Sequence, residues 1–274
     1  MFEKSVDGKT TKVTVRPPLV YLDHCGVRNI SRDQTLRDEF VAIFAERGTL
    51  LFSMMNILEA ARNSEKSHDE MREFLDRLGP HWIPCESDPE IVASNEARGV
   101  PPPRTFMMRL DLLAPVLRAA TDTFLLGTAV ATLHAEVGFR ERAPELLSGG
   151  RDRHALLQTI LQARERHRRG EKFPELKIPK HSVRWIELML SRRLATSGKT
   201  LDANDVNDLF HATVALASAH VIVLDSAWAE FGRSLRLDQT RVFSGAPNEL
   251  PKALQAVRDY RVSSFRLIEE ALGV

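Results

Sequence analysis

Four acidic side chains are of a type that could do chemistry together: Asp23, Glu59, Asp208 and Asp225. Two of them directly follow short apolar runs, and the other two stand among helix-forming residues. Carboxylates are ligands of hard divalent cations such as Mg²⁺ and Mn²⁺, which can leave coordination positions open for water or a phosphate oxygen. Taken singly, such a residue is more typical of a turn, a helix N-cap or a solvated helix face. What the four can do therefore depends on the elements that position them.

Short apolar runs rich in β-branched residues predict strands, and segments with helical spacing lie between them. We expect strands over 19–22, 49–52, 81–85, 220–224 and 241–243. We expect helices over 36–45, 53–62, 68–78 and 204–219, and from 249 nearly to the C-terminus. This alternation predicts an α/β fold with a central, mostly parallel sheet flanked by helices. Ligands of such sheets bind beyond the carboxyl ends of the strands, which is where Asp23 and Asp225 stand.

The middle third of the chain has a different pattern. Three consecutive prolines at 101–103 form a rigid spacer, and helical spacing follows over about 106–139, 153–169 and 182–195. We therefore predict a large helical insertion at 87–200, with the α/β core built from 1–86 and 201–274.

Charge is unevenly distributed along the chain. Lys and Arg number 38 against 37 Asp and Glu, a formal net charge of +1, but residues 140–193 hold 14 basic and 7 acidic side chains. Five basic residues gather near the end of one predicted helix: Arg164, Arg166, Arg168, Arg169 and Lys172. They suit contacts with nucleic-acid phosphates, and they also suit a solvated, basic helix C-terminus. The residues leave both interpretations open.

Composition and hydropathy exclude several classes of protein. Hydrophobic residues make up 43% and charged residues 27%, which disfavours a disordered or fibrous chain. The first residues are polar, and the longest nearly apolar stretches, 123–137 and 212–224, are too short to span a membrane. We therefore expect a cytoplasmic protein with no membrane partner. In that compartment Cys25 and Cys85 are expected as buried small hydrophobic residues.

The four acidic residues occur in strings that resemble those of one family when they are taken in order. These strings are Val20-Tyr-Leu-Asp23, Ser53-Met-Met-Asn-Ile-Leu-Glu59, Asp208-Leu-Phe-His-Ala-Thr-Val-Ala-Leu216 and Val221-Ile-Val-Leu-Asp225. The first and last strings are apolar strands that end in Asp, the second is a Ser followed by a helix that carries Glu, and the third is an Asp followed by an alanine-rich helix. In this order they resemble the PIN-domain family of metal-dependent nucleases. The resemblance covers roughly 18–85 and 201–250.

The resemblance implies a PIN-like sheet and a metal-dependent endoribonuclease that hydrolyses RNA phosphodiester bonds. It implies Mg²⁺ or Mn²⁺ as cofactor and Asp23, Glu59, Asp208 and Asp225 as catalytic residues. Asp23 and Asp208 are the expected metal ligands, and Glu59 and Asp225 are expected to complete the coordination shell of the ion or to orient its water. Asp205, one turn before Asp208, is the second choice for the same ligand position. The basic cluster around Arg168 is the expected RNA-binding surface.

Several features depart from the family pattern or leave alternatives open. His24 stands where many members carry Thr or a small residue, and the insertion is far longer than the family core. His211, on an apolar helix, is expected to be a satisfied core residue. DNA in place of RNA, a catalytically silent PIN-like module that binds RNA or protein, and a toxin paired with a separate antitoxin all remain alternatives. A homo-oligomer is also left open.

Overall fold

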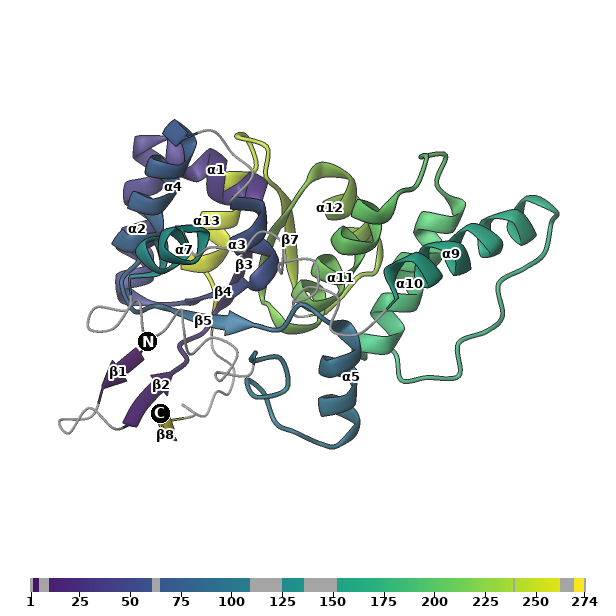
Figure 1. The fold of residues 1–274 in the computed structure, drawn as a ribbon, viewed down its shortest axis with the longest axis horizontal. Helices are drawn as coiled ribbons and strands as arrows, with labels where there is room; N and C mark the ends of the chain where they lie inside the picture. The colour runs from purple at the N-terminus through teal and green to yellow at the C-terminus, as the bar shows by residue number, and fades with distance from the viewer. Residues whose placement is uncertain are drawn as a thin grey trace.

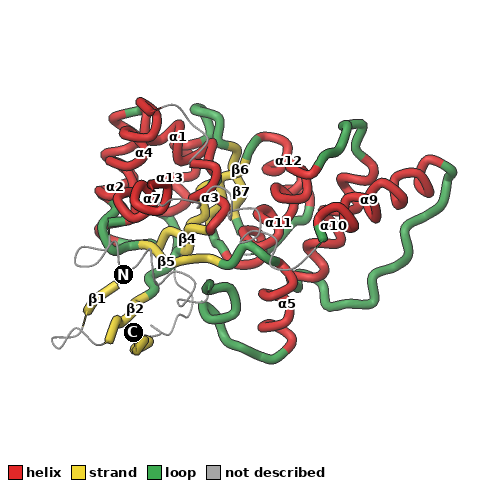
Figure 2. Tube along the Cα trace, in the orientation of Figure 1, coloured by secondary structure: helices red, strands yellow, loops and turns green. Residues whose placement is uncertain are grey.

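A five-stranded parallel sheet forms the centre of the protein in a computed structural model (Figures 1 and 2). The structure describes residues 2–4, 10–60, 65–108, 125–135, 152–238, 240–261 and 269–273. The strands are β3 (Leu19–Leu22), β4 (Thr49–Ser53), β5 (Trp82–Cys85), β6 (Val221–Leu224) and β7 (Arg241–Ser244), in the order β5-β4-β3-β6-β7. Val20 pairs with Leu50 on one side and with Val221 on the other. The predicted α/β class and parallel sheet are confirmed.

Burial explains why these short runs form strands. Every residue of β3, β4, β5 and β6 is buried, whereas β7 lies at an edge and exposes Arg241. Parallel strands are covered by helices on both faces, so their sequences are continuous apolar runs rather than alternating ones. The carboxyl ends of all five strands meet at one edge of the sheet, which is the edge that Asp23 and Asp225 follow.

One group of helices packs together beside the sheet, on the left in Figure 1. It contains α1 (His24–Arg32), α2 (Gln34–Glu46), α4 (Glu65–Arg77), α7 (Leu126–Ala135) and α13 (Leu250–Arg258). α7 packs closely on α4, because Gly127 has no side chain to meet the main chain there. A Cβ at Gly127 would lie 2.2 Å from the carbonyl oxygen of Arg72. The glycine is therefore required for this contact.

A second group of helices packs around α11 (Ala203–Ser218), toward the right in Figure 1. It contains α5 (Pro89–Ala97), α9 (Arg153–Arg168), α10 (Val183–Thr196) and α12 (Ser226–Ser234). α11 and α12 contact β6, so this group is joined to the sheet through α11 and α12. The remaining helix, α3 (Met54–Ala60), begins directly at the end of β4.

The described helices of 87–200 attach to the core at two separate places. α5, α9 and α10 pack with α11, and α7 packs with α4. Residues 109–124 and 136–151 of the predicted insertion lie outside the described residues. Of the predicted 106–139 helical pattern, α7 confirms 126–135, but Phe106 lies in a turn, Met107 pairs with Cys85 and Met108 is not helical, so the prediction is wrong for these three residues. Pairing with the end of β5 supplies the hydrogen bonds that a helix would otherwise make.

A second, three-stranded antiparallel sheet joins the two ends of the chain. It contains β1 (Phe2–Lys4), β2 (Thr10–Thr14) and β8 (Glu269–Gly273), in the order β1-β2-β8. The prediction of a helix from 249 nearly to the C-terminus is therefore wrong for 259–261 and 269–273, and residues 262–268 lie outside the described residues. Thr10 pairs with Gly273 across most of the chain, and such long-range pairing overrides the helix propensity of a Glu- and Ala-containing segment.

Over the described residues, no helix has both the length and the apolar character needed to cross a membrane.

Candidate metal centre

Asp23 and Asp225 lie next to each other at the carboxyl edge of the sheet, after the adjacent strands β3 and β6. The backbone N–H of Asp23 donates to the carbonyl of Val223, 2.9 Å away, and so links the two strand ends. Both residues are also N-caps: Asp23 Oδ1 accepts from the N–H of His24 at 2.7 Å, and Asp225 Oδ1 accepts from the N–H of Trp228 at 3.0 Å. Asp23 and Asp225 therefore each cap a helix and also lie side by side at the strand ends.

Glu59 reaches the same place from α3, whose start is fixed to the sheet by a buried polar network. The N–H and hydroxyl of Ser53 both donate to Asn56 Oδ1, at 2.8 and 2.9 Å. Asn56 Nδ2 in turn donates to the carbonyl of Leu22, 3.2 Å away at the end of β3. Through Asn56, Ser53 therefore links the start of α3 to the end of β3. This link fixes the direction of the helix on which Glu59 stands.

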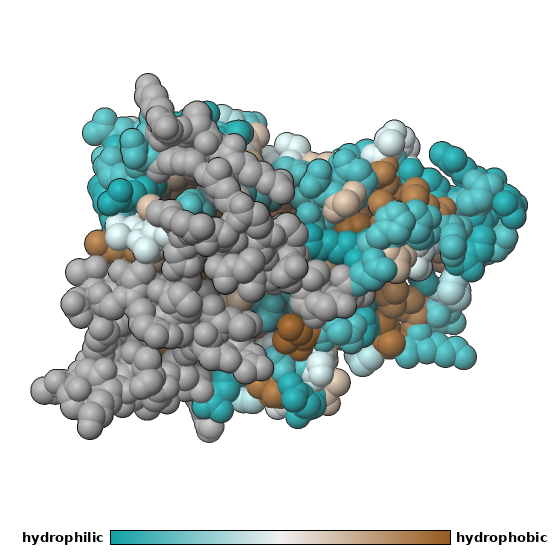
Figure 3. Space-filling model, viewed as in Figure 1, coloured by the Kyte–Doolittle hydropathy of each residue, from teal (hydrophilic) through white to brown (hydrophobic). Residues whose placement is uncertain are grey.

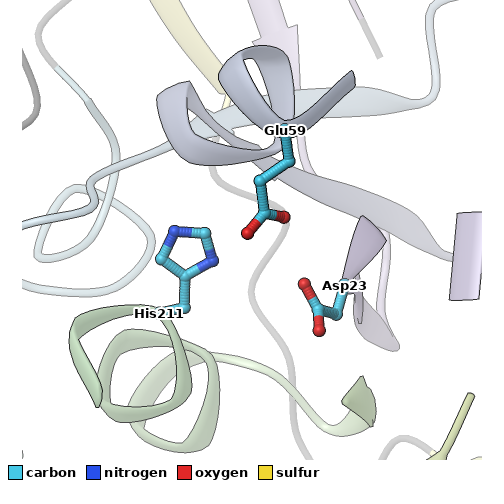
Figure 4. Close-up of side chains that lie close together, drawn as sticks. All are labelled: Asp23, Glu59 and His211. Carbon is cyan, nitrogen blue, oxygen red and sulfur yellow. The ribbon is translucent and has the colours of Figure 1, made fainter. Parts of the chain in front are cut away.

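His211 joins Asp23 and Glu59 from α11. One oxygen of each carboxylate and one ring nitrogen of His211 all lie within 4.8 Å of one another. Figure 4 shows the imidazole and the two carboxylates facing a common space. The prediction of a core residue fits the burial of His211, which is 5% exposed, and its Nδ1 lies 2.9 Å from the Tyr21 hydroxyl. That prediction overlooked its place beside the two carboxylates.

Asp208 stands three residues before His211, a spacing that places both side chains on neighbouring positions of α11. Burial, followed by the negative charges of Asp23 and Asp225, raises the pKa of Asp208 to about 7. Burial and the charge of Asp225 raise the pKa of Asp23 to about 6, against the lowering effect of its hydrogen bond from His24. The four predicted acidic residues therefore lie at one edge of the sheet, and their charges repel one another.

Asp205 is engaged elsewhere. Its Oδ2 accepts from the N–H of Asp202 at 2.9 Å, and Asp202 Oδ1 accepts from the N–H of Asp205 at 3.2 Å, which forms a capping box at the start of α11. The other oxygen of Asp205 is paired with Lys199. Of the two expected ligand candidates on this helix, the structure favours Asp208.

Electrostatics keep the imidazole of His211 uncharged. Burial, and then the positive charge of Arg153, lowers the pKa of His211 to about 3. The Tyr21 hydroxyl at Nδ1 fixes the orientation of the ring. A neutral imidazole is a common metal ligand. The Asp-x-x-His spacing on one helix was the signal in the sequence that could have indicated His211.

The basic cluster divides into two parts. Arg164 is only 8% exposed, and its guanidinium donates to the carbonyls of Ala195, Lys199 and Leu194 at 3.2, 2.7 and 2.8 Å. The main chain at the end of α10 needs these donors, so Arg164 holds that end together and is removed from the predicted phosphate-binding set. Four members of the cluster are exposed at the end of α9 and in the loop after it: Arg166, Arg168, Arg169 and Lys172.

The donor set fits a divalent cation. Two carboxylates and an imidazole lie close enough to share an ion, and two further carboxylates stand at the same edge. Burial, and after it the like charges of the neighbouring carboxylates, raises the pKa of Asp23 and of Asp208. No family model matches the chain, and no curated protein or solved structure matches it.

Proposed function

We propose that the protein is a PIN-like, metal-dependent endoribonuclease that uses Mg²⁺ or Mn²⁺. The observation that carries this proposal is the position of Asp23, Glu59, Asp208 and Asp225 at the carboxyl edge of one parallel sheet. The sheet order β5-β4-β3-β6-β7 brings the ends of β3 and β6 together, and α3 and α11 bring the other two carboxylates to them. This is the edge at which ligands of α/β sheets bind.

Asp23, Glu59 and Asp208 would hold the ion in this proposal, with Asp225 beside them. A bound divalent cation would lower the pKa of a water molecule and neutralise charge on the scissile phosphate. The N-termini of α1 and α12 stabilise the carboxylates of Asp23 and Asp225, which cap them, and so help to hold these anionic groups at the same edge.

The exposed basic residues at the end of α9 support RNA as the substrate. α9 begins at Arg153, whose charge acts on His211, and it ends at Arg168, on the right in Figure 1. A helix of 16 residues is about 24 Å long, so RNA that contacts both ends must extend several nucleotides from the cleavage position. Figure 3 shows a predominantly hydrophilic surface over the far end of α9, as phosphate contacts require.

The experiment is cleavage of an end-labelled, random-sequence RNA pool with Mg²⁺ or Mn²⁺. The proteins are the wild type, Asp23→Asn, Asp208→Asn and the control Asp238→Asn, which alters an exposed aspartate. Loss of a metal ligand should cost at least about 100-fold in rate, since loss of an outer partner of a ligand already costs about 10–100-fold. The control should cleave like the wild type. Full activity in both site variants would contradict the proposal.

The same experiment separates the proposal from the remaining alternatives. RNA binding with no turnover in either metal would favour a catalytically silent binding module. Cleavage of a matched DNA pool at a similar rate would widen the substrate class to DNA. Poor growth of cells that express the wild type, relieved by Asp23→Asn, would favour a toxin controlled by a separate antitoxin.

A further inference from the structure

The loop between α10 and α11 carries a lysine that is attached to both neighbouring helices. The carbonyl of Lys199 accepts from Arg164 Nη1 at 2.7 Å, and Arg164 lies one turn of α9 before the exposed Arg168. The ammonium of Lys199 donates to Asp205 Oδ1, and Asp205 lies about one turn of α11 before Asp208. Lys199 therefore lies between the basic end of α9 and the acidic edge of the sheet.

The two groups that hold Lys199 are buried, whereas its own side chain is not. Arg164 is 8% exposed and Asp205 is 3% exposed, but the side chain of Lys199 is 59% exposed. An ammonium has further N–H donors besides the one that Asp205 accepts. The positive charge is therefore held in place and can still bind an anion from solution.

The charge of Lys199 also acts on the acidic edge itself. Its hydrogen bond to Asp205, and after it the negative charges of Asp205, Asp208 and Asp225, raise the pKa of Lys199 against the lowering effect of burial. The ammonium is therefore positive at neutral pH. A phosphate that approaches this edge is repelled by the carboxylates, and a fixed positive charge beside them reduces that repulsion.

We infer that Lys199 binds a phosphate of the RNA backbone, on the path between the basic end of α9 and the cleavage position. This inference rests on the proposed function, because it concerns the substrate of the same site. Lysine binds phosphate as a point charge, without the fixed geometry that an arginine fork imposes. Such a contact orients the backbone and carries no information about the base sequence. Asp205 holds the ammonium and so acts as a positioning residue.

The first test is an acetylation footprint of the wild-type protein, with mass spectrometry to measure the modification of each lysine. The protein is treated with and without saturating single-stranded RNA. Ca²⁺, which also takes oxygen ligands, replaces Mg²⁺ or Mn²⁺, and electrophoresis verifies that the RNA stays intact. RNA should slow the acetylation of Lys199 and leave unchanged that of Lys252, which is exposed on α13. Equal acetylation of Lys199 with and without RNA would overturn the inference.

The second test is RNA binding over a range of salt concentrations in the same Ca²⁺ buffer, followed by fluorescence anisotropy. Loss of one phosphate contact in Lys199→Gln should reduce the slope of log affinity against log salt by about 0.7 in magnitude. Lys199→Arg keeps the charge and should keep the slope, as should the matched control Lys252→Gln. An unchanged slope in Lys199→Gln would overturn the inference and assign Lys199 only to the start of α11.

These measurements record binding apart from cleavage, so the two proposals fail in different ways. RNA that binds through Lys199 but is cleaved with neither Mg²⁺ nor Mn²⁺ would contradict the nuclease proposal alone. Cleavage by the wild type, together with an unprotected Lys199 and an unchanged slope in Lys199→Gln, would contradict the inference alone.

Discussion

At the scale of single residues, the buried acidic cluster carries an electrostatic cost. The pKa of Asp208 is raised to about 7 and that of Asp23 to about 6, because burial removes water and Asp225 adds a like charge. Each carboxylate would contribute more to stability if it were neutral. Sites that retain such a cost are typical of functional positions, because an ion or a substrate relieves it.

Asp208→Asn should therefore stabilise the metal-free protein at about pH 8, by about 2–4 kcal/mol in the free energy of unfolding. Between about pH 4 and pH 7 the folded carboxyl holds a proton that the unfolded carboxyl has lost, so wild-type stability falls as pH rises through this range. The gain from the substitution is complete above pH 7 and disappears as pH falls toward 4. Urea denaturation over this pH range, with a chelator present, measures it.

The matched control is Asp238→Asn, which alters an exposed aspartate and should lack the stabilisation expected of Asp208→Asn at about pH 8. A destabilised Asp208→Asn protein at about pH 8 would contradict the account of repulsion, since it would show that the negative charge of Asp208 has a compensating partner in the folded state.

The four acidic residues were selected by the resemblance of their strings to one family, because each residue alone is typical of a turn or a helix face; their role stays a prediction. The sequence was not sufficient for His211 or Arg164. The alanine-rich surroundings of His211 are the same whether the ring packs in a core or faces carboxylates, and only its tertiary contacts, such as the one with Tyr21 of β3, decide between them. Arg164 and Arg168 both stand in the basic part of one predicted helix. Only the packing of α10 makes Arg164 a buried hydrogen-bond donor.

At the scale of elements, all five strands of the central sheet could be predicted. The full burial of β3, β4, β5 and β6 requires continuous apolar runs, whereas the edge strand β7 exposes Arg241 and is marked only by Val242 and Phe243. α1 could not be predicted, since it begins within His24-Cys-Gly26 and its periodicity is short. β8 could not, because its partner β2 lies at the opposite end of the chain. Long-range pairing leaves no signal in a local window of sequence.

Arg164→Met should destabilise the protein by about 2–4 kcal/mol, because three carbonyls at the end of α10 would lose a charged donor. Thermal unfolding should show a melting temperature lower by several degrees. Arg168→Met, one turn further along α9 and exposed, is the control and should unfold like the wild type. Equal stability of the two variants would contradict the assigned role of Arg164.

At the scale of the whole molecule, exposed basic side chains gather at one end of α9, and carboxylates gather at the carboxyl edge of the sheet. Arg166, Arg168 and Arg169 are exposed together, although Glu165 pairs with Arg169 at 3.3 Å. Under the proposed function, the backbone of an RNA substrate would contact the basic end of α9 while its scissile phosphate lay at the acidic edge of the sheet. This division would separate binding from cleavage.

Replacement of Arg166, Arg168 and Arg169 by Gln should weaken RNA binding without changing Mn²⁺ affinity. Each contact with a single-stranded phosphate contributes about 0.7 to the slope of log affinity against log salt, so the slope should fall in magnitude by about 2. Fluorescence anisotropy over a range of salt concentrations measures this slope. A weaker affinity with the same slope would show that these residues do not contact phosphates.

The most direct test of the central claim is thermal unfolding with and without Mn²⁺ of the wild type, Asp23→Asn and Asp208→Asn. An ion that binds only the folded state at 100 times its dissociation constant adds about 2.7 kcal/mol, which corresponds to a rise of several degrees in melting temperature. We predict this rise in the wild type and its loss in both variants. No rise in the wild type, or an equal rise in all three proteins, would contradict the assignment of Asp23 and Asp208 as metal ligands.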